Sequence, residues 1–186
     1  MLFMRAVAGK RPKQASRGGV RLEAQRSAAA AAEPATQSMT IRPVRAADIA
    51  QVIALDEQVT GLAKPDYWQG LFQRYSRPSQ TEQFFLVAVA PDGASETLLG
   101  FILGEVRAWE FGSAPCGWVF ALSVRADQRL RGVGQVLLDA IAGKFRSSGV
   151  AKMRTMVARG NQLLMLFFRA GGMVSGPYME LEKDLR

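Results

Sequence analysis

Residues 122–135 constrain the fold more than any other part of the sequence. They read LSVRADQRLRGVGQ and pass from an apolar run through a polar turn into the start of a helix, with Gly132 and Gly134 at the junction. The first N–H groups of a helix have no partner within the helix, and the helix dipole adds positive potential there. Glycines leave such a backbone open to close approach by a ligand. With Arg129 and Arg131 beside it, this turn predicts a cradle for an anion such as a pyrophosphate.

The two glycines alone do not identify a ligand. The sequence has no third glycine that would complete G-x-G-x-x-G, and G-x-x-x-x-G-K-[ST] does not occur in it. The two common nucleotide-binding motifs therefore do not apply. A tight strand–helix turn without a ligand is the alternative that this signal leaves open.

Hydrophobic periodicity predicts the elements around this turn. We expect helices from Asp48, from Pro65, from Val133 to Gly149 and from Asn161 to Gly171. We expect strands at 40–44, 84–90, 98–109, 118–124 and 152–158, and a closing strand that begins near Tyr178. The order is a strand, two helices, three strands, and then helix, strand, helix and strand. It predicts an α/β fold in which a mixed sheet lies between helices.

Composition excludes several classes of protein. The chain has one cysteine, Cys116, and no histidine. It cannot form an internal disulfide, and without the two usual zinc ligands we expect no metal. Any proton relay has to use carboxylates, tyrosine, backbone or water, because no imidazole is present. No stretch approaches the roughly 18 consecutive apolar residues of a membrane-spanning helix, so we expect a cytoplasmic protein without a membrane partner.

Residues 1–38 differ in composition from the rest of the chain. They hold seven of the 24 basic and two of the 16 acidic residues, so most of the net charge of +8 lies there. Their alanine run and few large apolar side chains predict a disordered basic leader before one domain, residues 39–186. A transit peptide, a true start at Met39 and a basic tail for nucleic acid stay open as alternatives. We expect a solvated arm and no nucleic-acid partner.

Two motifs resemble those of the GNAT superfamily of N-acyltransferases. The family motif [Q/R]-x-x-G-x-[G/A], which follows a strand, matches Arg129 to Gly134. The family motif N-x-x-A-x-x-L-Y-x-x-x-G-F matches Asn161 to Met173 in degenerate form. The resemblance covers residues 39–186. It implies a GNAT-like acyl-CoA N-acyltransferase fold, with a central mixed and mostly antiparallel sheet and helices on both faces.

The resemblance also implies how acetyl-coenzyme A (acetyl-CoA) would bind as the co-substrate. The backbone of Leu122 and Val124 would pair with the pantetheine arm like an added strand, and Asn161 would hydrogen-bond to the same arm. The structural interpretation is that Leu122 and Val124 are core residues and Asn161 is a helix cap. The two interpretations are compatible, because the strand residues would bind the ligand through their backbone and not through their side chains. The turn would hold the pyrophosphate through residues Arg129, Leu130, Arg131, Gly132, Val133 and Gly134.

Two positions bear on proton transfer. Phe168 stands where the family often has a tyrosine that protonates the departing thiolate, and it is an expected contact of the cofactor. Phenylalanine cannot donate a proton, and Tyr178 is a substitute candidate, with a packing role as its favoured alternative. Glu105, within an apolar run, is the candidate base for the attacking amine. Its alternative is a structural role in which it ends its strand or pairs with Arg107.

The sequence therefore predicts transfer of an acetyl group from acetyl-CoA to a primary amine by direct attack. The expected partners are acetyl-CoA and an amine, which is a small molecule, a protein N-terminus or a lysine, and a homodimer is a further expected assembly. Acidic residues of the first two helices, Asp56, Glu57 and Asp66, are candidates for attracting a cationic amine, with a solvated helical face as the alternative. The second hypothesis for the whole chain is a regulatory module that binds acyl-CoA without turnover.

Overall fold

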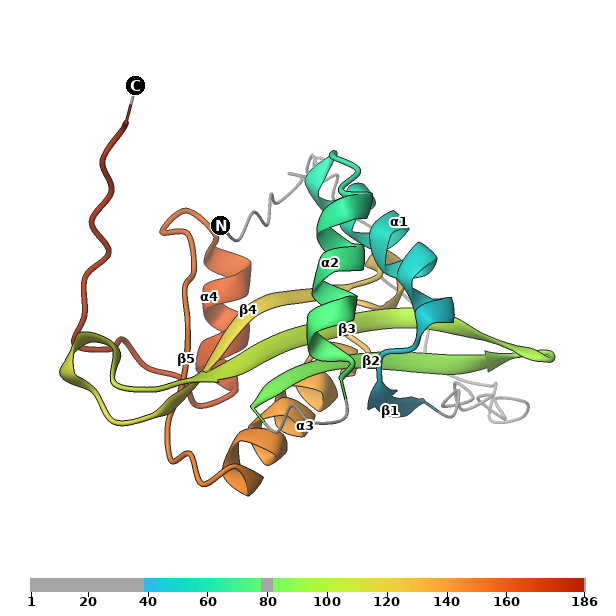
Figure 1. The fold of residues 1–186 in the computed structure, drawn as a ribbon. Coiled ribbons are helices and arrows are strands. Elements are labelled where there is room, and N and C mark those ends of the chain that lie inside the picture. The colour runs from blue at the N-terminus through green and yellow to red at the C-terminus, as the bar shows by residue number, and fades with distance from the viewer. Residues whose placement is uncertain (1–38, 78–81, 186) are drawn as a thin grey trace, which may run out of the picture.

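The computed structural model describes residues 39–77 and 82–185 (Figure 1). The helices are α1 (Ile49–Thr60), α2 (Pro65–Tyr75), α3 (Val133–Ser147) and α4 (Gln162–Ala170). The strands are β1 (Thr40–Pro43), β2 (Gln83–Asp92), β3 (Ser95–Arg107), β4 (Cys116–Val124) and β5 (Met153–Thr155). The predicted helices and the first five predicted strands are thereby confirmed, except that β5 covers only three of the seven residues predicted at 152–158. The basic leader lies outside the described residues.

The five strands form one sheet in the order β1-β2-β3-β4-β5. Neighbouring strands are antiparallel except β4 and β5, which are parallel. Helices α1 and α2 cover one face and α3 the other, as Figure 1 shows, and α4 shares the core of α3. The predicted mixed and mostly antiparallel sheet with helices on both faces is confirmed.

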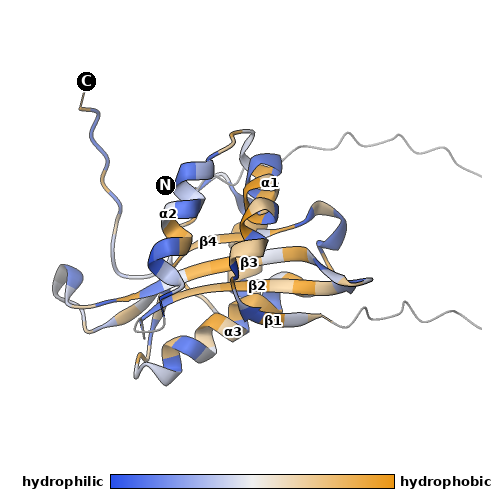
Figure 2. Cartoon of the chain, turned by 45° about the vertical axis from the view of Figure 1, so that its right-hand side comes forward, coloured by the Kyte–Doolittle hydropathy of each residue, from blue (hydrophilic) through white to orange (hydrophobic). Residues whose placement is uncertain are grey.

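The continuous apolar run of β2 serves two cores. Phe85, Val87 and Val89 belong to the core under α1 and α2, whereas the residues between them belong to the core under α3. Successive side chains of a strand point to opposite faces, so a strand covered on both sides has no polar alternation. Figure 2 shows the central strands as a hydrophobic band between the helices.

Two glycines bring α3 close to the sheet. A Cβ at Gly104 would lie 2.7 Å from Cζ of Phe145, and a Cβ at Gly117 would lie 2.4 Å from Cδ2 of the same ring. Phe145 is buried on α3 and fills the space that the missing side chains leave. Any larger residue at either position would push α3 outward, which would also move its N-terminus.

An ion-pair cluster joins β1 to the start of α1. Asp48 accepts hydrogen bonds from Nη1 and Nη2 of Arg42 at 2.7 and 2.9 Å and from the backbone N–H of Arg45 at 2.7 Å. Nε of Arg42 also donates to Glu96 at 3.1 Å. Burial by itself would raise the pKa of Asp48, but the hydrogen bonds from Arg42 and Arg45 outweigh it and hold that pKa below its ordinary value.

The prediction of a closing strand near Tyr178 was wrong. Residues 173–185 contain no strand, and Val174, Met179, Leu181 and Leu185 are exposed there. A strand needs the backbone of a neighbour, which local pattern does not supply. Tyr178 reaches β5 through its ring instead, with the guanidinium of Arg154 over it at 4.8 Å.

Candidate active site

β4 and β5 separate after a short paired stretch. They pair at three positions, 117–119 of β4 against 153–155 of β5. At the end of this stretch, Oγ1 of Thr155 donates to the carbonyl of Val119 at 2.8 Å. In the part of the chain that the structure describes, residues 120–124 of β4 have no strand on this side. The sheet therefore has an open edge that runs toward the glycine turn.

A β-bulge decides which backbone groups of β4 face this opening. The pairing of β3 with β4 skips Phe120. Before the bulge, the N–H of Gly117 points toward β5 and donates to the carbonyl of Lys152, the residue before that strand, at 2.9 Å. After it, the N–H of Arg125 donates to β3, to the carbonyl of Leu99 at 2.9 Å. Because backbone groups alternate between the two edges of a strand, those of residues 122 and 124 point into the opening.

Leu122 and Val124 thus combine core side chains with backbone groups on the open edge, a combination that the sequence analysis allowed. The side chain of Leu122 is buried in the core under α3, and Val124 packs against the same core. Their N–H and C=O groups nevertheless lie on the open edge. An extended, amide-bearing arm can pair with these groups as an added strand would.

The turn after β4 leads into α3, whose N-terminus has no side-chain cap. A short 3-10 helix, Ala126–Gln128, leads to Arg129, and Gly132 is the N-cap residue of α3 with φ of 81°. Glycine adopts this left-handed conformation without strain. It has no side chain to cap the helix, and the structure shows no side-chain cap hydrogen bond there. The first N–H groups of α3, those of residues 133–135, are therefore free of intrahelical partners and suit an anion.

Leu130 adds strain and exposure to this turn. Its φ is 67°, a conformation that residues with a side chain rarely adopt, and its side chain is fully exposed. Arg129 and Arg131 beside it are exposed as well. A strained, exposed leucine between two arginines does nothing for the core, and strain of this kind concentrates at ligand sites. The whole predicted cradle from Arg129 to Gly134 lies in this turn.

Gly134 has a different role from Gly132. A Cβ at Gly134 would lie 3.2 Å from Cε2 of Phe167 and 3.6 Å from Cγ2 of Val124. This glycine lets α4 approach α3 and places the Phe167 ring beside the open edge of β4. The sequence analysis attributed both glycines to ligand approach and did not identify Phe167. The only signal was that α4 is apolar on nearly all sides.

The two predicted residues of the second motif take structural positions. Oδ1 of Asn161 accepts a hydrogen bond from the N–H of Leu164 at 3.1 Å, so the helix-cap role is confirmed. Phe168 is 4% exposed and packs in the core, with its ring 5.1 Å from that of Phe167. Contacts of both residues with a cofactor remain predictions.

Glu105 lies on the opposite face of the sheet, at the end of α2. Its carboxylate accepts hydrogen bonds from the hydroxyl of Tyr75 at 2.5 Å and from Nε of Arg107 at 2.9 Å. The predicted pairing with Arg107 is confirmed. Burial, together with the hydrogen bond to Glu105, raises the pKa of Tyr75 above its ordinary value. Tyr75 therefore stays protonated and orients the carboxylate.

Glu105 also lies near the opening between β4 and β5. In the sheet it is paired with Trp118, two residues before the bulge at Phe120. The ring of Phe120 contacts that of Tyr75, with centroids 5.9 Å apart. Tyr75, which donates to Glu105 and contacts Phe120, thus links the carboxylate to the bulged residue of β4.

The acidic residues of the first two helices are partly engaged within the domain. Asp56 is buried, accepts a hydrogen bond from Nε1 of Trp68 at 2.9 Å and pairs with Nζ of Lys64 at 2.8 Å. Its contacts give it a structural role. Glu57 and Asp66 are exposed, as a solvated helical face requires.

No group of three or more histidine, cysteine, aspartate and glutamate residues lies close enough to hold a metal ion within 39–77 and 82–185. In the same ranges, no helix has the length and apolarity that crossing a bilayer requires.

Solved structures with this architecture include several N-acetyltransferases. The aminoglycoside N-acetyltransferase AAC(6')-Iy in complex with CoA superposes with a TM-score of 0.70 at 18% identity, over 83% of this chain and 99% of the other. Glucosamine-6-phosphate N-acetyltransferase from Arabidopsis thaliana gives 0.62 at 16%, over 80% and 99%. A protein described as a transcriptional regulator from Bacillus halodurans C-125 gives 0.66 at 13%, over 80% and 100%. These similarities show a common fold.

Sequence comparison identifies the family. No curated protein matches the sequence significantly. The model of the acetyltransferase (GNAT) family matches residues 50–172, which include the first motif, all but the last residue of the second, and most of the sheet. The chain belongs to the GNAT family of acetyltransferases.

Proposed function

We propose that the protein transfers an acetyl group from acetyl-CoA to a primary amine by direct attack. The observation that carries this proposal is the continuity of the open edge of β4 with the uncapped N-terminus of α3. The edge offers backbone groups of residues 122 and 124 to the pantetheine arm. The N–H groups of residues 133–135, with Arg129 and Arg131 beside them, suit the pyrophosphate.

The reaction needs little beyond positioning and one base. Glu105 takes a proton from the ammonium group, and the neutral amine then attacks the carbonyl carbon of the thioester. The C–N bond forms, the C–S bond breaks, and the second proton that the nitrogen loses goes through water to the thiolate sulfur. Glu105 then releases to solvent the proton that it took from the ammonium group. Holding both reactants in place supplies much of the rate. A backbone N–H of β4 next to the bulge polarises the carbonyl.

Phe168 favours the second hypothesis, a regulatory module that binds acyl-CoA without turnover. Its ring is buried in the core and offers no proton to the leaving thiolate. The two functions share the cofactor site and differ in turnover. Glu105, a carboxylate near the open edge of β4, favours the enzyme.

A thiol-release assay with a panel of primary amines tests the proposal. Acetyl-CoA with the purified protein should release CoA thiol only when a suitable amine is present, and mass spectrometry should show the acetylated amine. Titration calorimetry should show that acetyl-CoA binds. Binding without thiol release across alkyl amines, amino alcohols, amino acids and peptides would instead establish the regulatory module.

A further inference from the structure

Residues 179–185 have the pattern of a strand but form none. They read MELEKDL, so apolar and acidic side chains alternate from 179 to 182. In the part of the chain that the structure describes they belong to no helix or strand, and Met179, Leu181 and Leu185 are 76, 88 and 90% exposed. Figure 1 shows this red end of the chain running away from the domain. Alternation of this kind indicates a strand with one covered face, and its own domain leaves segment 179–185 uncovered.

β5 has an outer edge on the side away from β4. It is the last strand in the order of the sheet, and among the described residues no strand pairs with that side. The carbonyl of Lys152 accepts from the N–H of Gly117, so the backbone groups of residues 152 and 154 face β4. Those of Met153 and Thr155 therefore face outward, because backbone groups alternate between the two edges of a strand. An edge of this kind is a template for a further strand.

Segment 179–185 and this edge match in both polarity and charge. Placing Leu181 opposite Met153 brings the glutamates at 180 and 182 opposite the basic residues on either side of Met153, Lys152 and Arg154. This holds for parallel and for antiparallel pairing. Directly opposed residues project from the same face, so the acid–base pairs share one face, and Leu181 shares the other with Met153, which packs against the core under α3. A shift of one residue would put a glutamate opposite Met153.

A second copy of the chain is the partner that this geometry favours. The ring of Tyr178, the residue before the segment, lies against the guanidinium of Arg154 at 4.8 Å, so the segment leaves the domain beside β5. If Leu181 paired with Met153 of its own chain, Tyr178 would lie level with residue 156 or 150. That position is two or more residues, at least about 7 Å along the strand, from Arg154. Pairing with the β5 of another copy keeps Tyr178 in place.

Twofold symmetry closes such a contact. The segment and the edge that it matches lie next to each other on one side of the domain, so two copies that face each other there can exchange segments. Each copy then gives and receives one strand, and no edge is left for a third copy. Seven extended residues span about 23 Å, which is enough to reach along the β5 of a neighbour.

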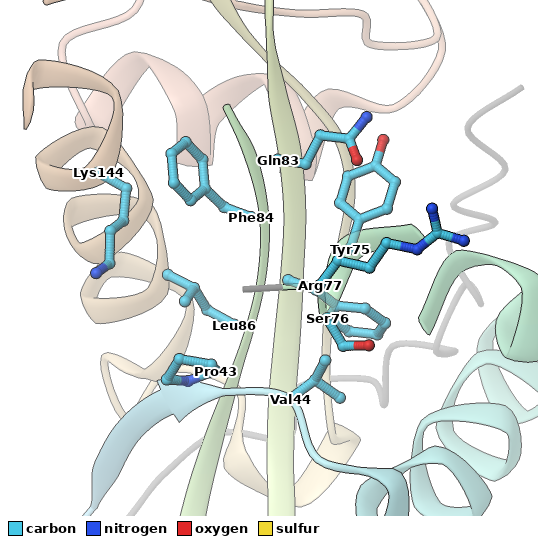
Figure 3. A pocket seen from close by; sticks show the side chains of 10 residues that line it. Pro43, Val44, Tyr75, Ser76, Arg77, Gln83, Phe84, Leu86 and Lys144 are labelled. Carbon is cyan, nitrogen blue, oxygen red and sulfur yellow. The ribbon is translucent and has the colours of Figure 1, made fainter. Parts of the chain in front are cut away.

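The opposite edge of the sheet is the other place where a strand could add. Past Pro43, the last residue of β1, a pocket of about 280 Å³ opens along β2. Figure 3 shows Phe84 and Leu86 on one side of this strand and Tyr75 on the other. A segment bound there would link copies head to tail across the whole sheet. Contacts of this kind build open chains unless their rotation happens to close a ring.

We propose that the protein forms a twofold-symmetric homodimer in which segment 179–185 of each copy adds to the outer edge of β5 of the other. The strand that the sequence predicts after Tyr178 is then formed between copies. Main-chain hydrogen bonds to residues 153 and 155 hold the added strand. Leu181 and the two acid–base pairs set its register. This inference does not depend on the proposed function.

Two leucine variants test the interface in sedimentation experiments on the whole chain. The wild type should sediment with twice the mass of one chain. Leu181→Asp should raise the dissociation constant of the dimer by about a hundredfold, because one apolar contact is lost at each of two symmetric positions. Leu185→Asp is the control. Leu185 is equally exposed in the single chain but lies four residues further along, past the end of β5 in either direction. It should leave the dissociation constant nearly unchanged.

Two charge-reversed chains test whether the contact is made between copies. One carries Glu180→Lys and Glu182→Lys, and the other carries Lys152→Glu and Arg154→Glu. Each alone places like charges at both contacts and should sediment as a monomer. In an equimolar mixture each segment meets a β5 of opposite charge, so a heterodimer should form. Circular dichroism should show the wild-type fold in each chain.

Three results would overturn the inference. The first is a wild type that stays monomeric up to its highest soluble concentration, or one that forms assemblies larger than a dimer. The second is an equal dissociation constant for the two leucine variants, which would place a dimer interface elsewhere. The third is a mixture of the folded charge-reversed chains that stays monomeric, because pairing within one chain gains nothing from mixing. If a charge-reversed chain fails to fold, the leucine variants still decide, since both leucines are exposed in the single chain.

Discussion

Substitution of Glu105 by glutamine separates its chemical role from its structural one. Glutamine has the size of glutamate but cannot take a proton. Its Oε1 can accept from Nε of Arg107, and its amide N–H can donate to the hydroxyl oxygen of Tyr75, so both contacts of Glu105 persist in neutral form. Hydrogen bonds to a charged group contribute roughly 1 kcal/mol more than neutral ones, so the two exchanges should reduce the free energy of unfolding by about 1–2 kcal/mol.

The effect on catalysis should be far larger. General-base catalysis contributes about 10²- to 10⁴-fold, so turnover in the thiol-release assay should fall by that factor. The affinity for acetyl-CoA should not change. A thermal midpoint lowered by only a few degrees, consistent with 1–2 kcal/mol, would show that the loss of turnover is not a loss of fold.

Glu110→Gln is the matched control. Glu110 lies 3.9 Å from Nη1 of Arg107 with its side chain 41% exposed, and its substitution should change neither turnover nor stability measurably. Wild-type turnover in Glu105→Gln would refute the role of Glu105 as a base. A raised KM with unchanged turnover would refute it too, and would show that the carboxylate only binds the ammonium group.

Three further predictions concern the cradle, the second motif and the domain. Arg131→Glu should weaken acetyl-CoA binding in calorimetry, because it reverses a charge beside the pyrophosphate. The control Arg146→Glu, in the last turn of α3, should not weaken it. Equal affinities of the two variants would place the phosphates elsewhere. Phe168→Tyr should lower the free energy of unfolding by about 1–3 kcal/mol, because it buries a hydroxyl in an apolar core. It should not raise turnover. A higher turnover with a new alkaline limb in its pH profile would mean that the ring reaches the thioester. Asp48→Asn should destabilise the domain by about 2–3 kcal/mol at neutral pH by removing one carboxylate partner of Arg42. The folded-state pKa of Asp48 is below its ordinary 3.8, so the ion pair stabilises the wild type only while Asp48 is ionised. In denaturation experiments, the difference in free energy of unfolding between wild type and variant should therefore shrink as pH falls below 3.8. A difference that persisted at lower pH would contradict the ion-pair explanation.

Local patterns determined most elements and the position of the glycine turn. The apolar stripe of α3 and the continuous apolar run of β2 each reflect burial that one segment undergoes, so periodicity along the chain reports it. Gly132 occupies a backbone conformation that favours glycine, which is also a local requirement. The base candidate Glu105 and its pairing with Arg107, two residues away, were likewise predictable.

Only the tertiary structure decided the features of the site that depend on the register between strands. The bulge at Phe120 turns the backbone groups of residues 122 and 124 toward the opening, and its presence depends on how β3 pairs with β4. Gln83 and Trp118 flank Glu105 only because three strands align at that level. The closing strand failed for the same reason: residues 179–182 alternate between apolar and charged side chains, as in a half-buried strand, but they pair with no described strand. The residues of one segment determine its preference for helix or strand. The partners of a side chain, in contrast, come from segments far apart in the chain, and the register between those segments cannot be read from the local sequence.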